Sequence, residues 1–221
     1  MFVVEDEPKS VAAESYRTLR TNLQYSSFDE EYKVIVVTSS EAGEGKSTTA
    51  GNLALSLSQG DKKVALIDCD LRKPSLHKKF KVSNTRGLSD VIIGKEEITS
   101  VFQRYNENLV IVTSGKVPPN PSEMLSSKAM SALIEALRKV FDYVILDTPP
   151  VQAVTDAQIL STKADGTILV VRAQETKKDS VNNAINLLKK VKANIIGTVL
   201  NGVEVSKQNY YYYYGTETEG K

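Results

Sequence analysis

Short apolar runs recur along the chain, and segments of helical periodicity separate them. Most runs are four residues long and apolar on both faces. Such runs are typical of parallel strands buried in a sheet that helices cover on both sides. The runs are Val34–Val37, Val64–Ile67, Leu109–Val112, Tyr143–Leu146, Ile168–Val171 and Ile195–Leu200, the last interrupted by Gly197 and Thr198. The pattern predicts a doubly wound α/β fold with a mostly parallel sheet and helices on both faces.

Apolar residues at helical spacing predict the helices between these strands. Residues 130–140 and 181–191 show this spacing, and so do residues 50–57, whose pattern ends at Gly60. The proline-rich segment 118–123 predicts a short rigid loop that starts a helix, because proline suits the first helical turn.

The N-terminal segment of about residues 9–27 predicts a two-sided helix. Its apolar stripe consists of Ala12, Tyr16, Leu19 and Leu23. Glu14, Arg17 and Arg20 lie beside one another on a different face. Two interpretations of this charged face stay open: solvated intrahelical ion pairs, or a contact with another subunit.

Composition limits the class of protein and its compartment. The 221 residues, 41% hydrophobic and 25% charged, suit one α/β domain, which we place at 1–205 with a separate tail at 206–221. A net charge of +1 gives no reason to expect nucleic acid or an anionic membrane as a partner. The single cysteine, Cys69, and an N-terminus without a signal-like pattern predict a cytoplasmic protein.

A phosphate-binding loop is predicted between the first apolar run and the helix that follows it. The segment reads Thr38-Ser39-Ser40-Glu41-Ala42-Gly43-Glu44-Gly45-Lys46-Ser47-Thr48. Backbone N–H groups around Gly43 and Gly45 would surround phosphate oxygens, Lys46 would approach the β and γ phosphates, and Ser47 would bind Mg²⁺. Ser40 departs from the motif, whose first position is glycine. A plain glycine-rich turn is the weaker interpretation, because strand, loop and helix occur in the required order.

Acidic residues follow two other predicted strands. Asp68, Asp70 and Arg72 come directly after residues 64–67, and Asp147 ends the strand at 143–146. Ligands bind at the carboxyl ends of strands in open α/β sheets. These carboxylates could therefore bind Mg²⁺ or act as a proton acceptor, and Arg72 could bind a phosphate. The alternative is a strand-ending turn with solvated acidic residues.

Five consecutive tyrosines, Tyr210, Tyr211, Tyr212, Tyr213 and Tyr214, stand near the C-terminus and make up half of the ten tyrosines. Such a run makes a poor core strand, because every face would carry a phenol. A sticky edge or an unstructured aromatic tail is the plain alternative to a set of phosphate acceptors.

Taken together, the phosphate loop, Asp-x-Asp-x-Arg at 68–72 and Asp-Thr-Pro-Pro at 147–150 resemble the bacterial tyrosine kinases. The similarity runs from the Glu14-x-x-Arg17-x-x-Arg20 helix to the tyrosine run. It implies a P-loop NTPase fold of the MinD/ParA type. It also assigns nucleotide contacts to Ala42, Gly43, Glu44, Gly45, Lys46, Ser47, Thr48, Arg72 and Asn201, metal ligands to Ser47, Asp68 and Asp147, and catalysis to Lys46, Asp68, Asp70 and Asp147.

The resemblance further implies an ATP- and Mg²⁺-dependent kinase that phosphorylates its own tail in trans and regulates capsular or exopolysaccharide synthesis. It implies a ring, of eight subunits when unphosphorylated, in which Glu14, Arg17 and Arg20 touch the neighbour. The implied partners are the cytoplasmic tail of a membrane modulator, a protein-tyrosine phosphatase and proteins of polysaccharide synthesis. The expected location is the cytoplasm, at the inner face of the plasma membrane. Either Asp68 or Asp70 is the implied base toward tyrosine.

Three other functions compete with this hypothesis. A partition-type ATPase switch carries a lysine at the position of Glu41 and has no tyrosine cluster. An iron protein with a shared iron–sulfur cluster needs more cysteines than Cys69. A nucleotide-gated scaffold without catalysis is disfavoured by the intact set of Lys46, Ser47 and three aspartates.

Overall fold

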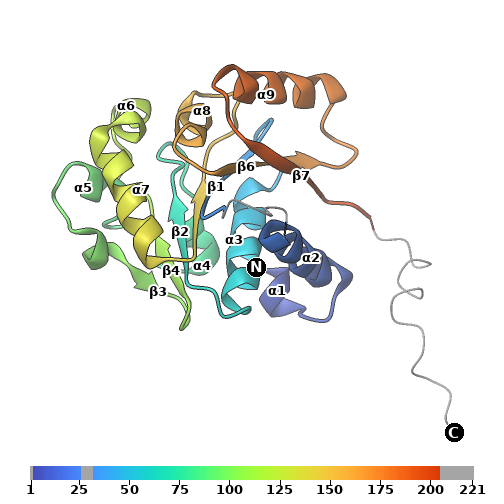
Figure 1. Ribbon diagram of the computed structural model, residues 1–221, viewed down its shortest axis with the longest axis horizontal. Coiled ribbons are helices and arrows are strands. Elements are labelled where there is room, and N and C mark those ends of the chain that lie inside the picture. The colour runs from blue at the N-terminus through green and yellow to red at the C-terminus, as the bar shows by residue number, and fades with distance from the viewer. Residues whose placement is uncertain (1, 26–31, 205–221) are drawn as a thin grey trace, which may run out of the picture.

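A seven-stranded sheet forms the centre of the molecule in the computed structural model, which describes residues 2–25 and 32–204 (Figure 1). The strand order is β3-β4-β2-β5-β1-β6-β7, and every pair is parallel except β3 with β4. The strands are β1 Val34–Ser39, β2 Val64–Asp68, β3 Gln103–Arg104, β4 Leu109–Val112, β5 Tyr143–Asp147, β6 Gly166–Arg172 and β7 Ile195–Asn201. The predicted doubly wound α/β class is confirmed. The predicted tyrosine tail lies outside the described residues.

Helices cover both faces of the sheet. They are α1 Val3–Asp6, α2 Val11–Tyr25, α3 Lys46–Ser58, α4 Leu76–Phe80, α5 Leu88–Ile92, α6 Pro121–Ser126, α7 Lys128–Val140, α8 Asp156–Ser161 and α9 Lys178–Lys190, with a 3₁₀ turn at Ile98–Val101. Alternation along β1 divides the core: Ile35 and Val37 pack toward α3, and Val34 and Val36 pack toward α7. Both faces of β1 are therefore buried, which explains its continuous apolar run from Val34 to Val37.

The structure contains short elements that the apolar pattern does not predict. Strand β3 has two residues and pairs antiparallel at the edge, and α1, α5 and α8 are four to six residues long. Pro121 stands in the first turn of α6, as expected. Within the described ranges, no helix has both the length and the apolar character needed to cross a bilayer.

The N-terminal helix α2 packs against α3, the helix that follows the phosphate loop. Tyr16 and Leu19 are partly buried against the core and Leu23 is buried. One guanidinium nitrogen of Arg20 donates to the carbonyl of Ser56 on α3 at 2.7 Å. Arg17 pairs with Glu14 at 2.8 Å within the helix. The charged face thus makes contacts inside the subunit.

Candidate nucleotide and metal site

The phosphate loop links the central strand β1 to α3. Gly43 and Gly45 have φ angles of 88° and 93°, a region that favours glycine. A Cβ built at Gly45 would lie 2.0 Å from Nδ2 of Asn201. The same Nδ2 donates to the Glu44 carbonyl at 2.9 Å, so the end of β7 contacts the loop directly. A side chain at position 45 would therefore displace both Asn201 and the loop.

Two buried carboxylates lie side by side beneath this loop. Asp68 on β2 pairs in register with Asp147 on β5. Alternation from Leu66 and Ile145, which both pack toward α3, places the two carboxylates on the α3 face. Both side chains are fully buried. The register of two neighbouring strands thus brings together acidic residues that are far apart in the sequence.

The two carboxylates differ in their hydrogen bonds. Asp68 accepts from the backbone N–H groups of Ser75 and Leu76 at 3.0 Å each, and from that of Asp70 at 3.2 Å. Neither carboxylate oxygen of Asp147 has a hydrogen-bond partner among the described residues. A buried, unsatisfied carboxylate is costly, so Asp147 is suited to a ligand that brings positive charge or donors.

Lys46 places a positive charge next to the acidic cluster. Its Nζ lies 3.3 Å from Oδ2 of Asp70 and 3.3 Å from Oγ of Ser47. Asp70 also accepts from the backbone N–H of Lys73 at 2.9 Å, which orients its carboxylate. The lysine, the predicted metal-binding serine and Asp70 therefore lie within reach of one another.

Burial and mutual repulsion set the pKa values of the cluster. Burial raises the pKa of Asp68 to about 7, helped by the charge of Asp147 and opposed by the N–H groups of Leu76 and Ser75. Burial likewise raises the pKa of Asp147 to about 6, although Lys46 and then Ser47 lower it. Burial lowers the pKa of Lys46, but Asp147 and Asp70 outweigh that effect and raise it. A divalent cation would favour the ionised form of both buried carboxylates.

Arg72 is held by a residue that the sequence did not single out. Its guanidinium binds the fully buried carboxylate of Asp156 through Nε at 3.0 Å and a terminal nitrogen at 3.2 Å. The same terminal nitrogen donates to Ser122 Oγ at 2.8 Å, and Ser122 donates to Asp156 at 2.6 Å. Arg72 therefore joins the starts of α6 and α8, and its predicted contact with a phosphate stays a prediction.

We expect Arg72→Met to lower the free energy of unfolding by about 2 kcal/mol, because it leaves the buried Asp156 carboxylate without its cation. The value is below that of a wholly buried pair, since 37% of the Arg72 side chain is exposed. Urea unfolding measures the change. Arg86→Met, which removes the exposed pair with Glu96, is the matched control and should change stability little. Equal stability of both variants would contradict this prediction.

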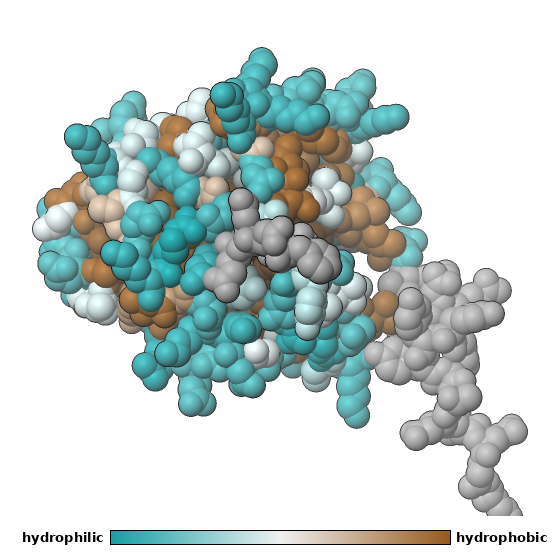
Figure 2. Space-filling model, viewed as in Figure 1, coloured by the Kyte–Doolittle hydropathy of each residue, from teal (hydrophilic) through white to brown (hydrophobic). Residues whose placement is uncertain are grey.

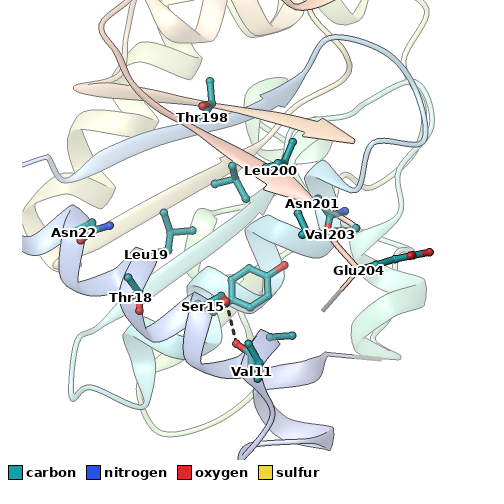
Figure 3. A pocket seen from close by; sticks show the side chains of 14 residues that line it. Val11, Ser15, Thr18, Leu19, Asn22, Thr198, Leu200, Asn201, Val203 and Glu204 are labelled. Atoms are coloured by element: carbon teal, nitrogen blue, oxygen red, sulfur yellow. Dashed lines mark hydrogen bonds between the residues drawn. The ribbon is translucent and has the colours of Figure 1, made fainter. Parts of the chain in front are cut away.

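A groove of about 530 Å³ lies between α2 and β7, beside the phosphate loop. Figure 3 shows Ser15, Thr18, Leu19 and Asn22 of α2 on one side, and Thr198, Leu200 and Asn201 of β7 on the other. Leu200 is 60% exposed, and hydrophobic surface is visible around this edge of the sheet below α9 (Figure 2). Because Asn201 lines the groove and also donates to the Glu44 carbonyl, the groove borders the phosphate loop at this residue.

Comparison with known proteins identifies the family. The ParA family model, described as a NUBPL iron-transfer P-loop NTPase, matches residues 31–212. The chain is 47% identical over 212 residues to tyrosine-protein kinase YwqD of Bacillus subtilis (strain 168), which covers 96% of this chain and 90% of the relative. The chain belongs to the bacterial tyrosine-protein kinases. The family hypothesis drawn from the sequence motifs is thus confirmed.

Solved structures of the family have the same fold. The chimerical protein CapA2B2 is 36% identical with a TM-score of 0.88, covering 92% of this chain and 90% of the other. The kinase domain of Escherichia coli tyrosine kinase ETK is 34% identical with a TM-score of 0.87, covering 93% and 83%. With the ParA match, these structures confirm the predicted P-loop NTPase architecture.

The remaining residues predicted from the family pattern lie around the loop. Ala42 is exposed at its tip, and Thr48 in the first turn of α3 accepts a hydrogen bond from Lys79 Nζ at 2.9 Å. Ser40, at the position where the motif has glycine, is buried, and its hydroxyl has no hydrogen-bond partner among the described residues. The nucleotide and metal roles themselves stay predictions.

The donor set fits a nucleotide with Mg²⁺ better than a metal ion alone. No group of three histidine, cysteine, aspartate or glutamate side chains in the described part of the chain is arranged to hold a metal by itself. Mg²⁺ usually takes one or two protein ligands together with water and substrate phosphates. The partnerless oxygens of Asp147 and the nearby Ser47 hydroxyl match that mode of binding.

Proposed function

We propose that this protein is an ATP- and Mg²⁺-dependent protein-tyrosine kinase that phosphorylates the tyrosine cluster of residues 210–214 on a neighbouring subunit. The observation that carries the proposal is the in-register pair of Asp68 and Asp147, buried under a phosphate loop whose Lys46 reaches Asp70. Membership of the bacterial tyrosine-protein kinases supports the same reaction.

Each side chain has a physical role in this proposal. The backbone N–H groups of the loop and the Lys46 ammonium hold the triphosphate and neutralise its charge. Ser47 and Asp147 would hold the cation, with Asp68 beside Asp147 in the register of β2 and β5. When bound, ATP would supply the phosphoryl group and Mg²⁺ would offset the charge that develops on its oxygens.

The acceptor tyrosine needs a base, and two candidates remain. A phenol with a pKa of about 10 is mostly protonated at neutral pH, so a nearby carboxylate would assist its attack. Asp68 has the raised pKa that suits a base, but three backbone N–H groups hold its oxygens. Asp70 is slightly more exposed and faces Lys46. Geometry thus favours Asp70 as the base, whereas pKa favours Asp68.

Transfer to a neighbouring tail requires an assembly of subunits. We propose a ring, of eight subunits when unphosphorylated, in which Glu14, Arg17 and Arg20 contact the next copy. The contacts of Arg17 with Glu14 and of Arg20 with Ser56 would then be shared or exchanged on assembly. Each phosphotyrosine adds about −1.5 to −2 charge, so phosphorylation of the whole cluster would loosen such a ring by repulsion.

The proposed setting is the cytoplasm, at the inner face of the plasma membrane. The cytoplasmic tail of a membrane modulator would bring the kinase there, and a phosphatase would reverse its modification. Capsular or exopolysaccharide synthesis would be the regulated process, with proteins of that synthesis as further substrates.

Mass spectrometry of the peptide that contains Tyr210–Tyr214 tests the proposed reaction. Dephosphorylated protein is incubated with ATP and Mg²⁺, with and without the cytoplasmic tail of a candidate modulator. We expect phosphate on these tyrosines, and none when EDTA removes Mg²⁺ or when ADP replaces ATP. ATP hydrolysis without tyrosine phosphate, even with the modulator, would overturn the kinase proposal and favour a partition-type ATPase.

A further inference from the structure

The phosphate loop carries two glutamates, and the segment between β6 and α9, together with the first turn of α9, binds both. Glu44 accepts a hydrogen bond from the Thr176 hydroxyl through Oε1. Glu41 accepts from the Ser180 hydroxyl through Oε1 at 2.5 Å. Gln152 adds a third link, since its Nε2 donates to Ser180 Oγ at 2.7 Å and lies 3.3 Å from the Ser40 carbonyl. Both carboxylates of the loop are thus anchored to the same neighbouring segment.

The Glu44 carboxylate is the more tightly held of the two. The residue is 3% exposed, and its Oε2 accepts from the backbone N–H of Glu41 at 2.9 Å. The hydroxyl of Thr176, which reaches Oε1, also accepts from the backbone N–H of Arg172 at 3.1 Å. The Thr176 oxygen accepts the N–H of Arg172, and the Thr176 hydroxyl hydrogen is directed at the Glu44 carboxylate.

These contacts have an electrostatic consequence for a polyanionic ligand. A phosphate loop binds through its N–H groups and lysine, and any carboxylate turned toward the same space would repel the phosphates. Such repulsion is strong where water is excluded, as it is around Glu44. Removal of the Thr176 hydroxyl would leave Oε1 of the buried Glu44 carboxylate without a donor, and the carboxylate would turn this oxygen toward other N–H groups of the loop.

We propose that Thr176 and Ser180 are positioning residues for nucleotide binding, which keep the Glu44 and Glu41 carboxylates turned away from the triphosphate. This inference rests on the nucleotide site of the proposed function, and not on the tyrosine acceptor. The two hydroxyls touch neither phosphate nor metal in this role. They act through the loop glutamates.

Titration calorimetry with MgATP tests the inference without any measurement of turnover. Thr176→Val keeps the side-chain shape and removes the hydroxyl, and we expect ATP affinity to fall about tenfold. Thr176→Ser restores the donor and should restore affinity. Ser180→Ala, which acts through Glu41, should weaken binding in the same direction. Thr162→Val is the matched control, because the Thr162 hydroxyl donates to the Ile159 carbonyl on α8 and not to a residue of the phosphate loop.

A double-mutant cycle separates charge repulsion from general loosening of the loop. In a Glu44→Gln background, the effect of Thr176→Val should shrink to less than about twofold, since the buried charge is gone. An undiminished tenfold loss in that background, or unchanged affinity in Thr176→Val and Ser180→Ala, would overturn the inference alone. Failure of the wild-type protein to bind MgATP would overturn the proposed nucleotide site as well.

Discussion

Lys46→Met is expected to reduce phosphorylation of the tyrosine cluster by at least about 10³-fold, because methionine removes the charge while it keeps an unbranched side chain of similar size. Lys46 places its ammonium group at the candidate phosphate site, with Nζ 3.3 Å from both Asp70 and Ser47. Without it, the phosphates would face Asp68, Asp70 and Asp147 without the ammonium group that lies beside Asp70. Quantitative mass spectrometry of residues 210–214 measures the loss.

The control for this variant is Lys163→Met. Lys163 donates to the Ser131 hydroxyl at 2.6 Å, away from the candidate site, so its loss should leave phosphorylation unchanged. Thermal unfolding of both variants checks the fold, because Lys46 also compensates buried carboxylates. Tyrosine phosphorylation that persists in folded Lys46→Met would mean that this loop does not hold the reacting phosphate.

Asp147→Asn is expected to lower phosphorylation by about 10²- to 10³-fold while stabilising the nucleotide-free protein at neutral pH. The loss of activity follows from a weaker hold on Mg²⁺. The gain in stability follows from the buried carboxylate, because burial raises its pKa more than Lys46 and Ser47 lower it and neither oxygen has a hydrogen-bond partner among the described residues. A residue that costs stability without ligand and supports turnover with ligand is common in active sites.

The pH dependence of stability gives this prediction a definite sign. The folded-state pKa of Asp147 is raised to about 6, so the folded chain binds this proton more tightly than the unfolded chain does. The tighter proton binding stabilises the folded chain at low pH, and this stabilisation is lost as pH rises through about 6. Asparagine does not ionise, so the variant does not lose this stability. Its free energy of unfolding relative to that of the wild type should rise between about pH 4 and 7, by on the order of 1–3 kcal/mol.

Urea unfolding across this pH range, without nucleotide, measures the difference. Asp142→Asn is the control, because Asp142 is exposed just before β5 and accepts from the backbone N–H of Lys63. The stability of Asp142→Asn relative to the wild type should not rise with pH in the way that we expect for Asp147→Asn. A pH profile of Asp147→Asn parallel to that of the wild type would show that this carboxylate is ionised at no cost.

The apolar runs were sufficient to predict six of the seven strands, because strands buried on both faces leave a clear signal. Strand β3 escaped detection, since two residues at an edge form no run. The phosphate loop could be predicted equally well, because its motif has a fixed spacing between a strand and a helix. Its glycines stand where the backbone has positive φ.

Contacts between loops could not be predicted in the same way. The pairing of Arg72 with Asp156 joins segments that are 84 positions apart, and nothing local at Asp156 indicates it. The link from Thr176 to Glu44 spans 132 positions and depends on where the loop after β6 turns. Strand register brings Asp68 to Asp147, but the hydrogen bonds that distinguish their chemistry come from the backbone of residues 70–76.

The pairing of β1 and β2 with β5 affects when the site can form during synthesis of the chain. Val34 pairs with Val144, and Val64 pairs with Tyr143, so the two strands that carry the loop and Asp68 depend on a strand about two thirds of the way along the chain. A ribosome must therefore release most of the chain before the two buried aspartates can meet. Nascent or truncated chains that end before β5 would hold the complete glycine loop and still lack the aspartate pair that completes the site.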